Sequence, residues 1–184
     1  MFHLAVDSAI ELGVLEARHD SLLCTLVDRN REHLRRWVPW LDNNTTVSDS
    51  RAFIDQARER YVNREGLDAG IWHRNRLAGL GSFNDIDWGN RRAGIGYWLS
   101  SDCQGRGIMT RSCAALIGHA FGKLDLNRVE IRCSPRNDRS RAIPTRLGFT
   151  HEGVIRQAEW LYDHFEDHEI YGLLAGEWPT SGER

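Results

Sequence analysis

The sequence has little of what secreted, metal-binding or membrane-embedded proteins need. Its 184 residues include only four cysteines, which have no CxxC spacing and no paired histidines at metal-ligand distance from them, and this argues against a disulfide framework and a zinc site. No apolar run approaches the length of a membrane span. The first twenty residues are acidic where a signal peptide is basic and then apolar. We therefore predict a cytoplasmic protein without a metal. The cysteines are Cys24, Cys103, Cys113 and Cys133.

An excess of positive charge is also missing. Lys and Arg total 24 against 26 Asp and Glu, and the formal net charge is -2. General nucleic-acid binding and binding to anionic membranes both need a summed positive field, so neither partner is expected, although a local arginine cluster can still hold an anion. With 41% hydrophobic residues, the chain can bury one core and is short for two. We predict a single domain over residues 1–184.

Hydrophobic periodicity predicts a mixed α/β fold. The stripe that runs from Met109 to Leu124 is the strongest helical signal, and weaker ones predict helices from Ser21 and from Asp49 or Ser50, the latter stopped by Gly66. Alternating segments predict a meander of antiparallel strands before the long helix and further strands after it. The predicted strands cover a segment near residues 12–15 and then 69–75, 76–87, 92–100, 128–134, 151–164 and 168–178.

A short glycine-bearing loop connects the strand "GYWLS" to the long helix. Gly105 and Gly107 leave the first amides of that helix open to a ligand, and such amides bind anions because they lack partners and lie at the positive end of the helix dipole. The alternative is a plain strand-to-helix turn. The loop is neither a Walker loop, since Ile108 follows the second glycine, nor a dinucleotide fingerprint, since position 110 is Thr.

The loop "QGRGIM" resembles the Gln/Arg-x-x-Gly-x-Gly/Ala motif with which the GNAT superfamily of N-acetyltransferases holds the pyrophosphate of acetyl-CoA. Gln104 and Gly107 match the motif, and Met109 departs from it. The segments "IGYWL", "RCSPRNDRSRA", "LGFTHEGVIRQAEWL" and "IYGLL" also follow the order and spacing of the Rim-type branch, the ribosomal-protein N-terminal acetyltransferases. The resemblance covers nearly the whole chain. It implies a GNAT fold with a mostly antiparallel sheet of about seven strands, splayed in the middle and flanked by about four helices.

The same resemblance implies an acetyl-CoA site without a metal. The strand that ends at Leu99 would splay from the strand over 128–134, and acetyl-pantetheine would lie in the gap. Asn137 matches a residue that contacts the pantetheine arm, although a turn asparagine is the plainer explanation. The remaining residues implied at the coenzyme are Trp98, Leu99, Ser100, Gln104, Gly105, Arg106, Gly107, Ile108 and Met109.

Two side chains are candidates for proton transfer. Glu159 matches a glutamate that acts as base through water in the Rim-type enzymes, and its alternative is an exposed strand carboxylate. Ser140 matches the serine that faces the coenzyme sulfur and would protonate the thiolate, but it is also a good N-cap for the helix that it would open. If it is the cap, Pro144 makes the first turn irregular. A backbone amide near Leu99 would meet the oxyanion.

Arginines and tryptophans supply further candidates. Arginines near "RNDRSR" are expected at the adenosine end of the coenzyme, where one or two would meet its 3′-phosphate, against the alternative of a solvated helix face. Three tryptophans resemble positions that wall the acceptor groove, although large aromatic residues more often lie in the core. The arginines are Arg136, Arg139, Arg141 and Arg146, and the tryptophans are Trp37, Trp40 and Trp160.

The acceptor amine is left open between alternatives. The resemblance implies the N-terminal Ser or Ala of a ribosomal protein. An α-amino group has a pKa of about 7.7 to 8.0 against about 10.4 for lysine, so one carboxylate suffices to deprotonate it. The alternatives are a small amine such as a polyamine, an aminoglycoside or an aminoacyl-nucleotide toxin, and a module that binds acetyl-CoA without catalysis. An exposed sheet edge would suit a homodimer.

Overall fold

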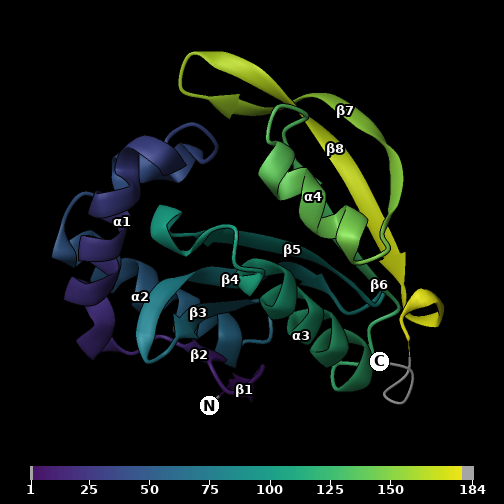
Figure 1. Ribbon diagram of the computed structural model, residues 1–184, viewed down its shortest axis with the longest axis horizontal. Coiled ribbons are helices and arrows are strands. Elements are labelled where there is room, and N and C mark those ends of the chain that lie inside the picture. Colours follow the sequence, from purple (N-terminus) through teal and green to yellow (C-terminus); the bar gives the residue numbers. More distant parts are fainter. Residues whose placement is uncertain (1, 180–184) are drawn as a thin grey trace.

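The structure is a computed structural model that describes residues 2–179 (Figure 1). Helices cover both faces of one sheet, as the α/β prediction required. The helices are α1 Asp20–Leu34, α2 Val47–Val62, α3 Ile108–Gly122 and α4 Asp138–Arg146, with 3-10 turns η1 Ala17–His19, η2 Pro39–Asn43, η3 Ser101–Cys103 and η4 Ala175–Glu177. The strands are β1 His3–Ala5, β2 Ile10–Val14, β3 Leu67–His73, β4 Arg76–Asp87, β5 Arg92–Leu99, β6 Arg128–Cys133, β7 Thr150–Leu161 and β8 His164–Leu174.

The sheet is splayed between its two central strands. Its order is β1-β2-β3-β4-β5-β6-β8-β7, and every neighbouring pair is antiparallel except β5 and β6. These two pair only from Arg92 with Arg128 to Gly94 with Glu130, and β5 continues to Leu99 without a partner on that side. The predicted splay is confirmed. The sheet has eight strands rather than about seven, because the three-residue β1 is too short to show an alternating pattern.

Two apolar clusters hold the helices against the sheet. On one face, α3 buries Leu116 and Ile117 with Ile131 and other strand residues, as its predicted stripe requires. On the other face, α1 and α2 pack with Leu80 and Trp98. The first cluster lies between α3 and one face of the sheet, and the second lies between α1, α2 and the other face. Strand β5, which borders the gap, is therefore packed on both of its faces.

The first two helices begin earlier than predicted. Helix α1 begins at Asp20 rather than after a Ser21 cap, and it buries Leu23, whereas Leu22 is exposed. Helix α2 begins at Val47, because Thr46 accepts a hydrogen bond from the backbone of Asp49, whose side chain in turn accepts from Thr46 in a capping box. It ends at Val62, before the predicted stop at Gly66.

The cap of α4 is Asn137, not Ser140. The Asn137 side chain accepts a hydrogen bond from the Ser140 backbone N–H at 3.1 Å, so Ser140 is the third residue of the helix. Pro144 consequently lies inside the helix rather than in its first turn. It has no N–H to give to the Ser140 carbonyl four residues earlier. The Tyr97 hydroxyl, from β5, donates to that carbonyl instead, at 3.1 Å.

Candidate functional site

Register across the gap between β5 and β6 fixes which side chains face α4. Continuing the Gly94–Glu130 pairing by three residues places Tyr97 level with Cys133, and Cys133 pairs with Glu169 of β8. Tyr97 contacts Ser140 of α4, and Glu169 contacts Arg141 of the same helix at 2.7 Å. All three residues therefore lie on the α4 face.

The next residue along each strand lies on the opposite face, because side chains alternate. This face carries Trp98, Ser134 and His168, and Trp98 packs there against the α1 and α2 cluster. The gap between β5 and β6 therefore opens onto both faces of the sheet, one beside α4 and one beside α1. The two faces present different side chains.

The loop before α3 presents free backbone amides. Within residues 2–179, no protein group accepts a hydrogen bond from the N–H groups of Gly105 to Met109, and the first bond of the helix runs from Arg111 to the Gly107 carbonyl. Gly105 and Gly107 have φ angles of +73° and +69°, which L side chains rarely adopt. The Gln104 N–H differs, because it donates to Ser101 at 3.4 Å. The arrangement suits a diphosphate.

Gln104 connects the two sides of the gap through its side chain. Its amide nitrogen lies 2.7 Å from His33 Nε2 in α1, and its amide oxygen accepts from Arg139 in α4. Burial lowers the pKa of His33, so the neutral ring can accept this hydrogen bond. Arg111 steadies the same loop by donating to the carbonyl of Arg106 at 3.2 Å.

At the end of β5, the directions of the backbone groups decide which residue can contact a molecule in the gap. A Cβ on Gly79 would lie 2.1 Å from the Trp98 carbonyl oxygen, so this carbonyl points toward β4. Ser100 donates to Ala78 at 2.7 Å and accepts from Cys103 at 3.0 Å, so both of its backbone groups are engaged. Because successive N–H groups alternate in direction, the Leu99 N–H points into the gap. Of the three residues Trp98, Leu99 and Ser100, Leu99 is the one whose backbone N–H is directed into the gap.

Ser140 and Tyr97 form a hydroxyl pair on the α4 face. The Ser140 hydroxyl donates to the Tyr97 oxygen at 3.2 Å, while the Tyr97 hydroxyl donates to the Ser140 carbonyl. Burial raises the pKa of Tyr97 well above its usual value, so its proton stays in place. Sequence analysis did not assign Tyr97 a role, because the interaction depends on Pro144, which lies 47 residues away. Asn137 is committed to capping α4.

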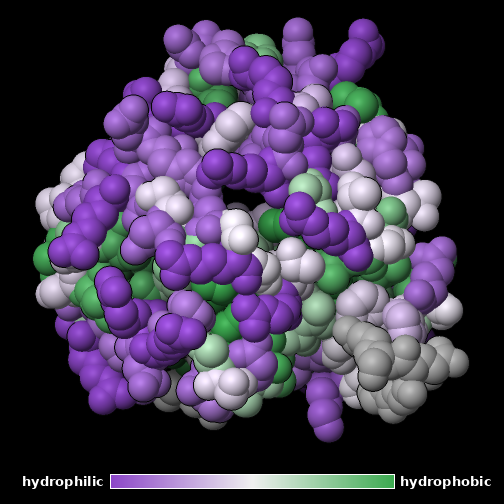
Figure 2. Space-filling model, in the orientation of Figure 1, coloured by the Kyte–Doolittle hydropathy of each residue, from purple (hydrophilic) through white to green (hydrophobic). Residues whose placement is uncertain are grey.

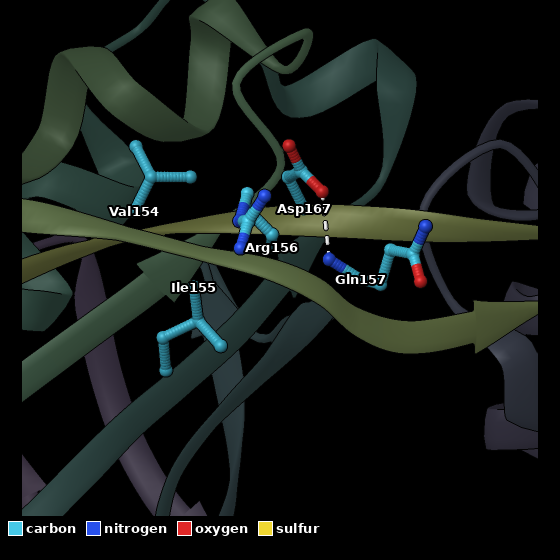
Figure 3. A pocket seen from close by; sticks show the side chains of 5 residues that line it. All are labelled: Val154, Ile155, Arg156, Gln157 and Asp167. Carbon is cyan, nitrogen blue, oxygen red and sulfur yellow. Dashed lines mark hydrogen bonds between the residues drawn. The ribbon is translucent and has the colours of Figure 1, made fainter.

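Glu159 follows an irregularity in β7 (Figure 3). Ile155 pairs with His168 and Glu159 with Glu166, so residues 156–158 oppose only Asp167, which accepts from the Gln157 N–H at 2.7 Å. Figure 3 shows this bond. The five residues drawn there line an open hollow of about 720 Å³. A bulge of this kind redirects the side chains that follow it.

The Glu159 carboxylate lies 3.4 Å from His168 Nε2. Both side chains are half-buried and lie on the face opposite α4, His168 one strand from β6 and Glu159 two strands from it. His168 was missed by sequence analysis, since nothing in the spacing of the two residues signals a bulge. The contact places an imidazole beside the carboxylate.

The tip of the β7–β8 hairpin contacts α1 and the segment that follows it. Tyr162 donates to the Val38 carbonyl at 2.6 Å, and the Arg35 guanidinium lies 4.0 Å from the centre of its ring. Figure 1 shows the hairpin reaching over toward α1, and Figure 2 shows the surface hollowed at the middle of this view. The buried indole N–H of Trp98, on the α1 face, has no acceptor among the residues that the structure describes. The tip of the β7–β8 hairpin thus bridges to the segment that follows α1.

Two of the arginines expected at the adenosine end are committed elsewhere. Arg136 pairs with the buried Glu166, and Arg141 with the buried Glu169. Arg139 is bound to Gln104, and only Arg146 has no such contact in the described part of the chain.

Two of the three tryptophans are exposed, against the expectation of a core position. Trp40 lies 6.4 Å from Trp98, and 53% of Trp160 is exposed beside Phe165. Trp37 is half-buried. Trp160 follows Glu159 directly and so lies on the other face of β7.

Residues 2–179 contain no group of three or more His, Cys, Asp or Glu side chains placed to hold a metal ion. None of the helices in this range is both long and apolar enough to cross a membrane. All four cysteines are free thiols.

Comparisons with known proteins agree on one family. A family model described as an acetyltransferase (GNAT) domain matches residues 13–150. YdaF of Bacillus subtilis (strain 168), which carries a provisional ribosomal N-acetyltransferase name, is 35% identical over 179 residues, 97% of this chain and 98% of the relative.

Two solved structures are similar over nearly the full length. RimL, a ribosomal L7/L12 alpha-N-protein acetyltransferase in complex with coenzyme A, is 31% identical with a TM-score of 0.92, covering 96% of this chain and 99% of that one. The microcin C7 self-immunity acetyltransferase MccE, in complex with acetyl-CoA and AMP, is 33% identical with a TM-score of 0.89, covering 92% and 94%.

Proposed function

Because the chain belongs to the family of acetyltransferase (GNAT) domains, an N-acetyltransferase family that uses acetyl-CoA, we propose that its acceptor is the N-terminal α-amino group of a ribosomal protein. The parting of β5 from β6 beyond Gly94, beside five free loop amides, is the observation that supports use of the coenzyme, and the similarity to RimL and YdaF supports the acceptor. We further propose that one catalytic domain spans residues 1–184, of which 2–179 are described, and that it works in the cytoplasm.

The coenzyme supplies an activated acetyl thioester, and the residues present fit it. The amides from Gly105 to Met109 would hold the diphosphate, and the parted strands would admit the pantetheine arm. The Leu99 N–H, directed into the gap, would stabilise negative charge on the acetyl oxygen. Gln104 would steady the mouth of the gap rather than bind phosphate, because both ends of its amide are engaged.

Proton transfer would use the two faces of the gap separately. Glu159 would accept the proton of the amine through water, with His168 fixing the carboxylate from 3.4 Å. Ser140 would protonate the leaving thiolate, and Tyr97, to which it donates, would hold its hydroxyl in place until then. The base and the acid would thus lie on opposite faces of the sheet. The amine would lose its proton on one face, and the thiolate would gain a proton on the other.

An α-amino terminus suits this site for two reasons. Its pKa of about 7.7 to 8.0 allows one carboxylate to deprotonate it near neutral pH, whereas the lysine pKa of about 10.4 makes this harder. The bridged rim, where Tyr162 contacts Val38, would admit a chain end more readily than the middle of a chain.

A free-thiol assay tests the proposed acceptor. Acetyl-CoA is offered with peptides that start with Ser, Ala or Met, with spermidine, and with an aminoglycoside. We expect thiol release with the Ser and Ala peptides. Release with the small amines alone would reject the ribosomal acceptor and favour the second candidate, small-amine acetylation, which the bridged rim also suits. Coenzyme binding without any release would favour a non-catalytic module.

Partner chains belong to the same proposal. Strand β7 lies at the edge of the sheet, and its exposed residues include Val154 and Ile155. An unpaired edge with apolar side chains suits a homodimer. Sedimentation velocity at increasing concentration would reveal such a dimer.

A further inference from the structure

A second cavity lies on the β4 side of β5, away from β6. Its volume is about 380 Å³, and its walls come from α1, from the turn between β3 and β4, and from the segment 100–106. Three exposed arginines line it, namely Arg29 of α1, Arg76 of β4 and Arg106 of the glycine loop, and His73 adds an imidazole. We call this space the arginine cavity.

Buried hydrogen bonds build the wall of the arginine cavity. Asn30, which is 3% exposed, donates to the Ser100 hydroxyl at 2.9 Å and accepts from the Ser101 N–H at 2.8 Å. The Ser100 hydroxyl donates to Asp102 at 2.6 Å. The one carboxylate in the lining is therefore already bound to the wall. Such a satisfied buried network is rigid, so the cavity is held open by the fold.

The positive charge of the arginine cavity is only partly balanced by the protein, because Asp102 is the one carboxylate in the lining, and its pKa is lowered by the Ser100 hydroxyl and by the charge of Arg76. Across residues 2–179, the guanidinium groups of Arg29, Arg76 and Arg106 form no hydrogen bond or ion pair with a carboxylate. The arginines of α4 that the sequence suggested for a phosphate, Arg136 and Arg141, are by contrast neutralised by buried glutamates. Like charges around one cavity repel each other unless an anion lies between them.

We propose that the arginine cavity binds a phosphate monoester, the 3′-phosphate of the coenzyme. This assignment rests on the proposed function, in which the amides of Gly105 to Met109 hold the coenzyme diphosphate. Arg106 belongs to both places, because its amide is one of those free groups while its side chain lines the cavity. The 3′-phosphate is separated from the diphosphate by one ribose. Guanidinium forks match the oxygens of a phosphate in geometry and charge.

Calorimetric titration of the full chain with coenzyme A and with 3′-dephospho-coenzyme A tests the assignment. We expect the wild type to bind coenzyme A at least about tenfold more tightly, since each hydrogen bond between charged groups contributes about that factor. Arg76→Gln and Arg29→Gln should each reduce this preference, and raised salt should weaken it. Lys123→Gln is the matched control, because it removes one positive charge from the exposed C-terminal end of α3, far from the glycine loop, and should keep the preference.

The possible results separate this inference from the proposed function. If neither coenzyme binds, the proposed function fails, and with it this assignment. If both bind equally well, or if the preference survives Arg76→Gln and Arg29→Gln together, the cavity is not the 3′-phosphate site. A third arm measures thermal stabilisation by inorganic phosphate. Stabilisation that Arg76→Gln removes, alongside equal binding of the two coenzymes, would assign the cavity to free phosphate and overturn the coenzyme assignment.

Discussion

The hydroxyl of Tyr97 takes the place of the N–H that Pro144 lacks, and this substitution can be measured as a coupling free energy. In the wild type, the Ser140 carbonyl accepts from Tyr97 at 3.1 Å because residue 144 has no N–H to donate. Tyr97→Phe should therefore leave a carbonyl without a partner and lower the free energy of unfolding by about 1 to 3 kcal/mol. In a Pro144→Ala background, the new N–H can reach the same carbonyl, and Tyr97→Phe should cost about 1 kcal/mol less.

Urea unfolding of the four proteins in this double-mutant cycle provides the measurement. A coupling of about 1 kcal/mol corresponds to a difference of roughly 0.5 M in the shift of the midpoint at a typical urea dependence. Tyr61→Phe is the control, since its hydroxyl has no hydrogen bond within the described residues, and it should cost under about 0.5 kcal/mol in both backgrounds. If Tyr97→Phe lowers the free energy of unfolding equally with proline and with alanine at position 144, the Tyr97 hydroxyl does not take the place of the missing N–H.

Three further predictions concern the loop, the base and the acid stability. Gly107→Ala, at φ +69°, should destabilise the fold by about 1 to 2 kcal/mol and weaken coenzyme binding in calorimetry, whereas unaltered affinity would contradict the loop assignment. Glu159→Gln should lower kcat at neutral pH by about a hundredfold with little effect on coenzyme affinity, and full activity would remove it as the base. The hydrogen bond from Arg136 lowers the pKa of Glu166, so its stabilisation is present above the unfolded pKa of about 4.3 and is lost as pH falls through the lower folded value. Acid titration followed by circular dichroism should show the wild type losing more stability than Glu166→Gln below about pH 4.3, and parallel curves would refute the role of the pair.

Patterns that depend on neighbours in the sequence predicted the main elements. The apolar stripe marked the long helix α3, and alternation marked the meander of β3, β4 and β5, because one buried face imposes a period on each. The free amides of Gly105 and Gly107 likewise followed from local chemistry, since only glycine takes their φ angles without strain. These predictions needed no knowledge of tertiary contacts.

Features that depend on distant residues were missed. Asn137 and Ser140 are both good caps, and the choice between them depends on how the chain leaves β6. The contact of His168 with Glu159 depends on a bulge in β7 that no hydrophobic pattern marks. The arginine cavity gathers side chains from three elements, so its positive charge is invisible in a chain whose net charge is -2.

The central claim is that the loop amides and the Leu99 N–H, beside strands that part, grip the coenzyme. Titration of the isotopically labelled protein with coenzyme A, followed through the amide resonances in NMR, tests it at the atoms concerned. We expect the largest shifts at Gly105 to Met109, with a distinct shift at Leu99. Coenzyme that binds while these amide resonances stay in place, and moves those of another surface instead, would contradict the account.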